Sequence, residues 1–174
     1  LTEGFLYTPA NDLDAFIKLC EAHPEICAVM VEPIQGEGGV HPLDKDFFEG
    51  VGAYAKEHDI LLVVDEVQTG NGRTGKLYGY MNYDVTPDII TFAKGSNSGY
   101  VPLGGVFMSD VVYDTFAEKV FPVGLTYSGH PLACAPVVAT FEVFEEEKIL
   151  DRVNDLAERV IRPRLEAMRD KHAI

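Results

Sequence analysis

The chain has 174 residues, of which 47% are hydrophobic and 10% aromatic, and its formal net charge is −14. This composition is typical of a globular protein and excludes a disordered one, and the length is sufficient for a sizeable hydrophobic core. The strong negative charge argues against nucleic acid and anionic membranes as partners. No apolar run reaches the roughly 18 residues of a membrane span, so we expect no membrane partner.

The cysteines are few and irregularly spaced. They number three, Cys20, Cys27 and Cys134. An odd count without metal-like spacing indicates reduced thiols in a reducing compartment, and therefore predicts a cytoplasmic protein. The five histidines are scattered along the chain, so the sequence predicts no metal site.

Helical and strand patterns alternate along the chain. Asp12 is a favourable N-cap for a helix over 13–22, which His23-Pro24 ends. Apolar runs between turn signals indicate strands that are buried on both faces. The expected strands are 26–31, 60–64, 89–92 and 105–109, and the further helices are 44–58, 77–83, 110–119 capped by Asp110, 132–147, and 149–171 broken or kinked at Pro163. This alternation predicts an α/β fold with a doubly wound, mostly parallel sheet.

Two of these strands are followed by ionisable residues. Asp65 follows the strand 61–64, and Lys94 lies just past the strand 89–92. In open α/β sheets, ligands gather outside the carboxyl ends of the strands. A carboxylate and an amine at that edge are candidates for chemistry, although such residues are more often solvated loop residues.

Seven short motifs surround this pair in a characteristic order. They are EPIQGEGG at 32–39, DEVQTG at 65–70, GRTG at 72–75, PDII at 87–90, AKG at 93–95, PLG at 102–104 and TYSGHP at 126–131. Together they resemble the class III aminotransferases, which use pyridoxal 5'-phosphate (PLP). The resemblance covers essentially the whole chain. It implies the large domain of the fold-type I PLP-dependent transferases, in part.

The resemblance also implies a domain organisation. Residues 1–147 would form part of the PLP-binding large domain, and 148–174 a helix leading toward a small C-terminal domain outside the chain. Members of the family are much longer than this chain, and the sequence opens without a Met and stops within a helical pattern. We therefore expect an internal fragment of a larger enzyme. The loop that cups the phosphate, and the aromatic residue that stacks on the ring, would precede Leu1.

Three residues would hold the ring of PLP by this resemblance. Lys94 would form a Schiff base with it and later move a proton between substrate and cofactor. Asp65 would keep the pyridine nitrogen protonated, which the cofactor needs as an electron sink. Gln68 would donate a hydrogen bond to the phenolic oxygen. The alternatives are that Lys94 is solvated, that Asp65 caps the following loop, and that Gln68 is a surface residue.

Two further residues receive roles from the resemblance. Thr126 would reach the phosphate of PLP held by a partner subunit, so the enzyme would be a homodimer or larger assembly with shared active sites. Glu37 would pair with an arginine beyond the chain and gate the substrate carboxylate site. Otherwise Thr126 belongs to a simple helix-entry loop, and Glu37 is a solvated acid. We expect Glu66 to point elsewhere and support the loop.

The implied activity is transamination. An ω-amino or acetylornithine-like donor would give its amino group to a keto acid such as pyruvate or 2-oxoglutarate, and the loop 96–101 would help to shape substrate choice. The motifs fit equally a class III aminomutase or racemase. A non-catalytic relative that only binds a ligand is the remaining alternative, against which Lys94, Asp65 and Gln68 argue.

Overall fold

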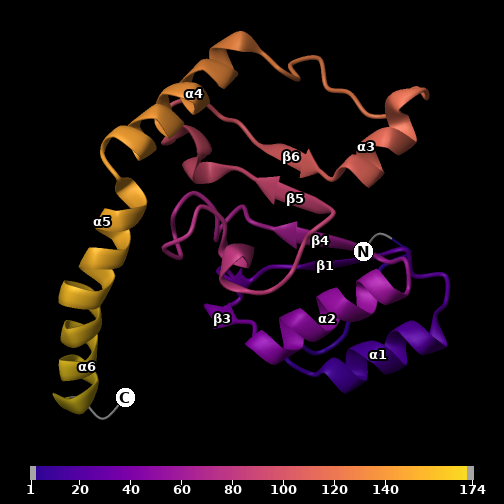
Figure 1. Ribbon diagram of the computed structural model, residues 1–174, viewed down its shortest axis with the longest axis horizontal. Coiled ribbons are helices and arrows are strands. Elements are labelled where there is room, and N and C mark those ends of the chain that lie inside the picture. The colour runs from indigo at the N-terminus through magenta and orange to yellow at the C-terminus, as the bar shows by residue number, and fades with distance from the viewer. Residues whose placement is uncertain (1–2, 172–174) are drawn as a thin grey trace.

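A computed structural model describes residues 3–171 of the chain, and its helices and strands alternate as the sequence predicts (Figure 1). In chain order the elements are α1 (Leu13–Ala22), β1 (Ala28–Val31), β2 (Ile34–Gln35), β3 (His41–Pro42), α2 (Lys45–Glu57), β4 (Leu61–Asp65), η1 (Gly79–Asn82), β5 (Ile89–Phe92), η2 (Lys94–Asn97), β6 (Gly105–Met108), α3 (Asp110–Ala117), α4 (Pro131–Glu146), α5 (Ile149–Leu156), η3 (Ala157–Ile161) and α6 (Arg162–Lys171). Here η1 and η2 are 3-10 turns and η3 is a π-helical turn.

Four strands form the central sheet in the order β1-β4-β5-β6. The β1–β4 and β4–β5 pairs are parallel, whereas β5–β6 is antiparallel. The predicted α/β fold with a mostly parallel sheet is therefore confirmed. Because β4 and β5 run in the same direction, the residues that follow them emerge at one edge of the sheet.

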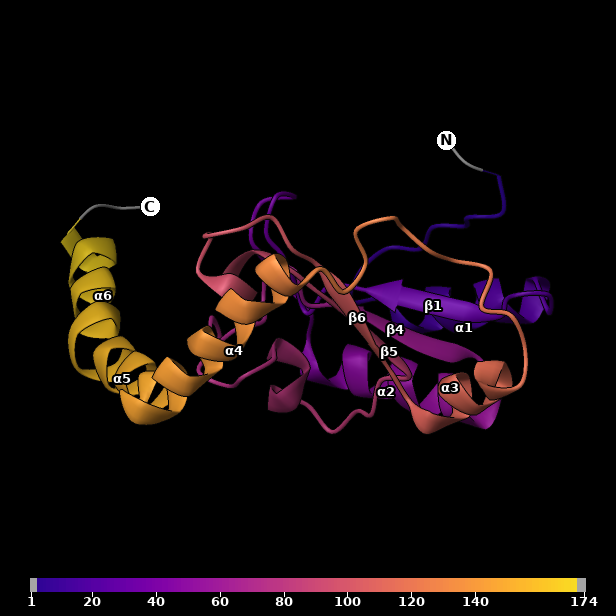
Figure 2. The same cartoon turned by 90° about the horizontal axis from the view of Figure 1, so that it is seen from above.

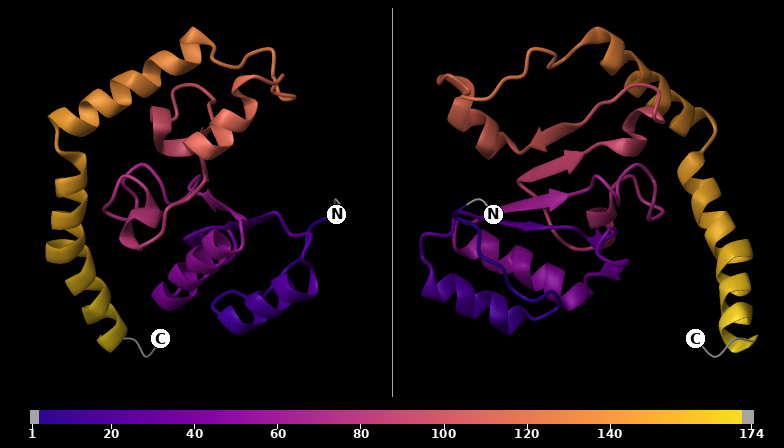
Figure 3. Two further views of the ribbon diagram at one scale, coloured as in Figure 1. Left: turned by 45° about the vertical axis from the view of Figure 1, so that its right-hand side comes forward. Right: turned by 180° about the vertical axis from the view of Figure 1, so that it is seen from behind.

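The two faces of the sheet have different surroundings. Leu62 and Val64 of β4 are buried against α1 and α2, which lie side by side along this face (Figures 1 and 3). Met30 and Val106 point to the opposite face by the strand register and are 57% and 53% exposed. Helices of the described chain therefore cover one face of the sheet near β1 and β4, and the other face is open there.

The hydrophobic core lies between α2 and β4. Phe48 and Val51 of α2 and Val64 of β4 have no exposed surface. Phe16 and Cys20 of α1 belong to the same core. The spacing of the apolar residues along α2 places them on one stripe of the helix, which is why this stripe faces the sheet.

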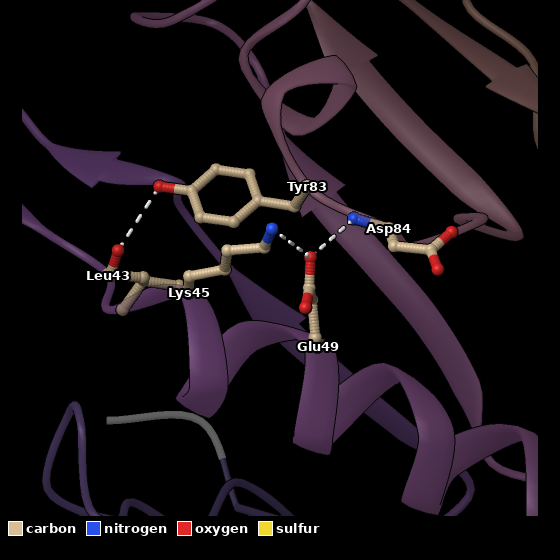
Figure 4. A network of polar contacts seen from close by, with 5 residues as sticks. All are labelled: Leu43, Lys45, Glu49, Tyr83 and Asp84. Carbon is tan, nitrogen blue, oxygen red and sulfur yellow. Dashed lines mark hydrogen bonds and ion pairs between the residues drawn. The ribbon is translucent and has the colours of Figure 1, made fainter.

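Polar contacts join α2 to the segment that precedes β5 (Figure 4). The Tyr83 hydroxyl donates to the Leu43 carbonyl oxygen at 3.1 Å, and the Asp84 amide donates to Glu49 Oε1 at 2.7 Å. Lys45 Nζ lies 3.8 Å from the same carboxylate oxygen. These contacts hold the crossover between β4 and β5 against the helical layer.

Two details of the first half differ from the sequence prediction. The expected strand 26–31 is the shorter β1, and its residues alternate between exposed and half-buried. The prediction of a strand buried on both faces was wrong because β1 is an edge strand with one open face. The segment 34–42, for which the sequence predicted no strand, forms a two-stranded antiparallel hairpin of β2 and β3.

Two predicted helices are shorter than expected. The pattern over 77–83 forms only the 3-10 turn η1, and α3 ends at Ala117 with Ser109, not Asp110, at the N-cap position. The helix 149–171 continues through Pro163, and its irregularity lies on the N-terminal side, in η3. A proline ring clashes with the carbonyl four residues earlier, here that of Arg159, and the wider π turn relieves that clash.

The last helices leave the sheet. Figure 2 shows α5 and α6 at one end of the molecule, apart from α1 and α2. The assignment of 148–174 to the approach of a second domain stays a prediction, and residues 172–174 lie outside the described part. Across residues 3–171, no helix combines the length and the apolar character that crossing a bilayer requires.

Candidate functional site

The site begins at the carboxyl end of β4, where two acids separate to opposite sides. Leu62 and Val64 point into the core, so Asp65 lies on the open face beside Thr91 of β5. Asp65 Oδ1 accepts a hydrogen bond from the Val67 amide at 2.9 Å. Asp65 therefore does cap the following loop. Within residues 3–171 this is the carboxylate's one hydrogen bond, so Oδ2 is left available.

Glu66 turns the other way and is completely buried. Its carboxylate accepts hydrogen bonds from the Thr69 hydroxyl at 2.6 Å and from the amides of Gly79 and Tyr80 at 2.8 and 2.7 Å. The prediction that Glu66 supports the loop is confirmed. This carboxylate fixes the turn 67–70, which carries Gln68, against η1.

Lys94 opens η2 directly after β5. Its backbone has φ +48°, a left-handed conformation that is uncommon for a residue with a side chain. The side chain is exposed, and its Nζ donates a hydrogen bond to Gln68 Oε1. Lys94 and Gln68, which are 26 residues apart in the chain, therefore meet at the sheet edge, at the turn that Asp65 begins.

The β2–β3 hairpin reaches the same place. A Cβ atom added to Gly36 would lie 2.5 Å from Gln68 Cγ and 2.8 Å from Gln68 Nε2, so the glycine permits the close approach of this side chain. Glu37 is the next residue and is exposed. The structure thus brings the Glu37 turn to the site, without a contact between Glu37 and Lys94 among the hydrogen bonds and ion pairs of residues 3–171.

Thr126 lies elsewhere. It is exposed in the segment before α4, where the Ser128 amide donates to the Leu125 carbonyl at 3.0 Å. A contact of α4 with the residue that follows η2 is made farther along, at Thr140, whose hydroxyl is 3.5 Å from Ser98 Oγ. The helical rise puts the start of α4 about 14 Å along the axis from Thr140. No hydrogen bond or ion pair of residues 3–171 joins Thr126 to Lys94 of the same chain.

Asn71 is a residue of the site that sequence reasoning missed. Its Nδ2 donates to the Ala93 carbonyl at 3.2 Å, next to Lys94. An asparagine inside a glycine-rich loop is a frequent choice for left-handed backbone, and Asn71 has φ +55°. That signal predicts the conformation of the backbone but gives no indication of the partner.

Comparison with known proteins identifies the family. The model of the family described as aminotransferase class-III matches residues 8–174. The chain belongs to this family. The class III aminotransferase resemblance that the seven motifs carry is therefore confirmed.

Curated relatives and solved structures agree with this assignment. The chain is 39% identical over its whole length to an acetylornithine aminotransferase of Caldanaerobacter subterraneus, of which it covers 42%. It is 39% identical to the chloroplastic gamma aminobutyrate transaminase 3 of Solanum lycopersicum, over 89% of this chain and 31% of that protein. A taurine:2-oxoglutarate aminotransferase from Bifidobacterium kashiwanohense, solved with PLP and glutamate, superposes with a TM-score of 0.84 at 40% identity, over 95% of this chain and 39% of that one.

These matches confirm the fold and set its extent. The (S)-enantioselective omega-transaminase from Thermomicrobium roseum gives a TM-score of 0.76 at 43% identity, over 79% of this chain and 32% of that one. This class III aminotransferase chain thus has the fold-type I architecture in part. It spans about two fifths or less of the length of these relatives. In residues 3–171, no cluster of three or more His, Cys, Asp or Glu side chains is arranged to hold a metal ion.

Proposed function

We propose that the protein is a PLP-dependent aminotransferase that moves an amino group from an ω-amino donor to a keto acid. The observation that carries this proposal is the contact of Lys94 Nζ with Gln68 at the carboxyl edge of the sheet, on the turn that starts at Asp65. Membership of the class III family supports it. The names of similar proteins, which include acetylornithine, gamma-aminobutyrate and taurine:2-oxoglutarate, favour an ω-amino or acetylornithine-like donor and a keto acid such as 2-oxoglutarate or pyruvate.

The side chains at this edge fit the ring end of PLP. An amine can bond the aldehyde carbon, a carboxylate can face the ring nitrogen, and an amide can donate to the ring oxygen. Gln68 uses Oε1 to accept from Lys94, which leaves its Nε2 hydrogens for such a donation. When bound, PLP supplies an electron sink for the bonds of the substrate's amino carbon.

Each side chain then has a distinct task. Lys94 would hold the aldehyde carbon through Nζ and, once displaced by the donor, carry a proton on the same atom. Asp65 would keep the ring nitrogen charged through its free oxygen, because an opposite charge nearby favours the protonated form. Glu37 would gate the substrate carboxylate from the neighbouring turn. Its position supports this role, because it follows Gly36, which lies against the Gln68 side chain.

The decisive experiment asks whether Lys94 bonds the cofactor. The full-length protein mixed with PLP should show a visible absorption band that borohydride abolishes, and peptide mass spectrometry should then place the reduced pyridoxyl group on Lys94. Lys94→Ala should lose both signals. Label on a different lysine, or PLP that binds without bonding, would contradict the proposal and favour a ligand-binding relative.

Asp65→Ala tests the role of the carboxylate. We expect the cofactor still to bind, while the single-turnover rate of transamination falls by about 100-fold or more, the scale of losing a charged partner. Asp84→Ala is the control, because Asp84 is exposed and its amide bonds Glu49 of α2, which belongs to the helical layer (Figure 4). Equal rates in the two variants would remove Asp65 from the mechanism.

The proposal includes a homodimer with shared active sites. The segment before α4 exposes large apolar side chains, with Leu125 78% and Tyr127 79% exposed beside Thr126. A second subunit would cover them and receive Thr126 at the phosphate of its own cofactor. We expect Leu125→Arg to give monomers in sedimentation and Leu165→Arg, on α6, to leave the assembly intact. A dimer that survives Leu125→Arg would contradict this arrangement.

The proposal places the enzyme in the cytoplasm. Cys27 and Cys134 are exposed and unpaired and Cys20 is buried and unpaired, which suits a reducing compartment. A donor and acceptor screen on the full-length protein would identify the substrates.

A further inference from the structure

We propose that Asn71 is a positioning residue that holds the backbone of Lys94 in its working conformation. The inference rests on the proposed function, since it concerns the lysine that would bond PLP. It starts from the left-handed backbone of Lys94, with φ +48°. A residue with a side chain stays in such a conformation only when its surroundings hold it there.

Asn71 contacts the chain on both sides of Lys94. Its Nδ2 donates to the carbonyl oxygen of Ala93, the preceding residue, at 3.2 Å. On the other side, a Cβ atom added to Gly95 would lie 2.9 Å from Asn71 Cβ, so the asparagine packs directly against the following residue. The Ser96 amide donates to the same Ala93 oxygen at 3.2 Å. Asn71 thus clamps the turn that begins at Lys94.

The clamp is itself anchored. Gly72, the next residue, packs closely against α4 and α5, because an added Cβ would lie 3.1 Å from Leu150 and 3.2 Å from Phe144. Asn154 of α5 donates to the Gly75 carbonyl at 3.0 Å. The loop that carries Asn71 therefore rests on the corner between α4 and α5.

Within residues 3–171, the Asn71 side chain makes its one hydrogen bond to the Ala93 carbonyl. Asn71 Oδ1 is buried and has no hydrogen-bond partner within residues 3–171, so the amide is oriented by its Nδ2 bond and by packing. Asn71 has φ +55°, which glycine and aspartate also tolerate. Asn71→Gly and Asn71→Asp therefore remove the donor while keeping the backbone.

The test compares these variants with Asn82→Gly. Asn82 belongs to η1 and donates to Thr74 Oγ1 and the Gly79 carbonyl at 3.1 and 3.0 Å, so its variant also loses side-chain hydrogen bonds, but neither of them reaches a residue beside Lys94. In the full-length protein, the rate at which PLP bonds Lys94 should fall about tenfold in Asn71→Gly, the scale of one lost hydrogen bond. Asn82→Gly should stay within about twofold of the unmodified rate, even if it lowers thermal stability.

A second measurement needs no cofactor. Hydrogen exchange at the Ser96 amide should be about tenfold faster in Asn71→Gly and unchanged in Asn82→Gly, because only the first variant loosens the Ala93 carbonyl. Equal effects of the two variants, or none from Asn71→Gly, would overturn the inference. If Asn71→Gly does not fold, Asn71→Asp takes its place with the same expectations. If the unmodified protein does not bond PLP at Lys94, the proposed function fails, and hydrogen exchange alone then decides the role of Asn71.

Discussion

The part of the chain built on α2 and β4 is tightly packed, whereas most apolar side chains of the segment 105–131, from β6 to the start of α4, are exposed. Phe48 of α2 has no exposed surface, while Val120, between α3 and α4, is 91% exposed. Apolar residues are about as frequent in the sequence from α2 to β4 as in the segment 105–131. The difference is that α2 and β4 find complementary surfaces within the described chain, and the later segment does not.

This contrast separates the candidate site residues that are held by packing within the described chain from those that lie on an exposed surface. Asp65, Gln68 and Lys94 are attached to the packed part through Glu66 and the parallel strands. Thr126 belongs to the exposed segment 105–131. An exposed apolar surface of this kind usually marks an interaction site, which agrees with the proposed dimer. Under the proposed function, the ring end of the site would be built within one chain, and the phosphate end would need a second one.

Removing a core ring should have the largest effect on stability. Phe48→Ala is expected to lower the free energy of unfolding by about 3–5 kcal/mol, because the cavity cannot collapse between α2 and β4. Urea unfolding followed by circular dichroism would measure it.

The matched control lies in the uncovered segment. Phe121→Ala, measured in the Leu125→Arg background where subunits are expected to be apart, should cost about 1 kcal/mol, since Phe121 is 45% exposed. A loss as large as that of Phe48→Ala would mean that this segment is packed within the monomer, and the contrast between the two parts would fail.

The buried carboxylate of Glu66 should give the next largest effect. Glu66→Gln leaves one acceptor oxygen for three donors, those of Thr69, Gly79 and Tyr80, and is expected to cost about 2–3 kcal/mol. Glu49→Gln is the comparison: that carboxylate is 27% exposed and accepts one amide bond beside an ion pair (Figure 4), so about 1 kcal/mol or less should be lost. Equal losses would show that the Glu66 contacts are no stronger than those at the surface.

Much of the fold could be predicted from the sequence because its signals are local. The stripe of α2, the N-cap Asp12 of α1 and the runs that form β4 and β5 each contain their own evidence, and Asp12 does accept a hydrogen bond from the Ala15 amide. The exposed face of β1 could not be predicted. It is exposed because no helix of the described chain covers that face, and the sequence of the strand contains no sign of this. The hairpin at 34–42 is likewise set by pairing across a glycine-rich turn, which has no apolar pattern.

The candidate site could also be predicted in part. Strand order alone brings Asp65 and Lys94 to one edge, and the family motifs single out Gln68 as well. The contact of Asn71 with Ala93 spans 22 residues and depends on two left-handed backbone positions, so no local pattern reveals it. In the last helix, the proline at 163 predicts strain, but the sequence does not indicate that the irregular π turn forms on its N-terminal side.

The smallest expected effect comes from alkaline pH and probes the packed part again. Burial raises the pKa of the Tyr78 hydroxyl, and the nearby negative charge of Glu66 raises it further; burial and Glu66 raise the pKa of Tyr80 in the same way. A pKa that is higher in the folded than in the unfolded protein means that the folded state retains its proton longer. Stability from these groups is therefore complete below about pH 10, where tyrosine is neutral in both states, and is lost as the pH rises toward the higher folded pKa.

Urea unfolding between pH 9 and about pH 11 should show this loss, with a slope of at most about 1.4 kcal/mol per pH unit for each tyrosine. Tyr78→Phe removes one titrating group and should flatten the slope, whereas Tyr100→Phe, in an 83% exposed position, should not. Glu66→Gln should flatten it only in part, because burial is the larger cause of the raised pKa. A slope that is the same in all three variants would show that the tyrosines around Glu66 are not desolvated, and the distinction between a packed and an exposed part would lose its electrostatic support.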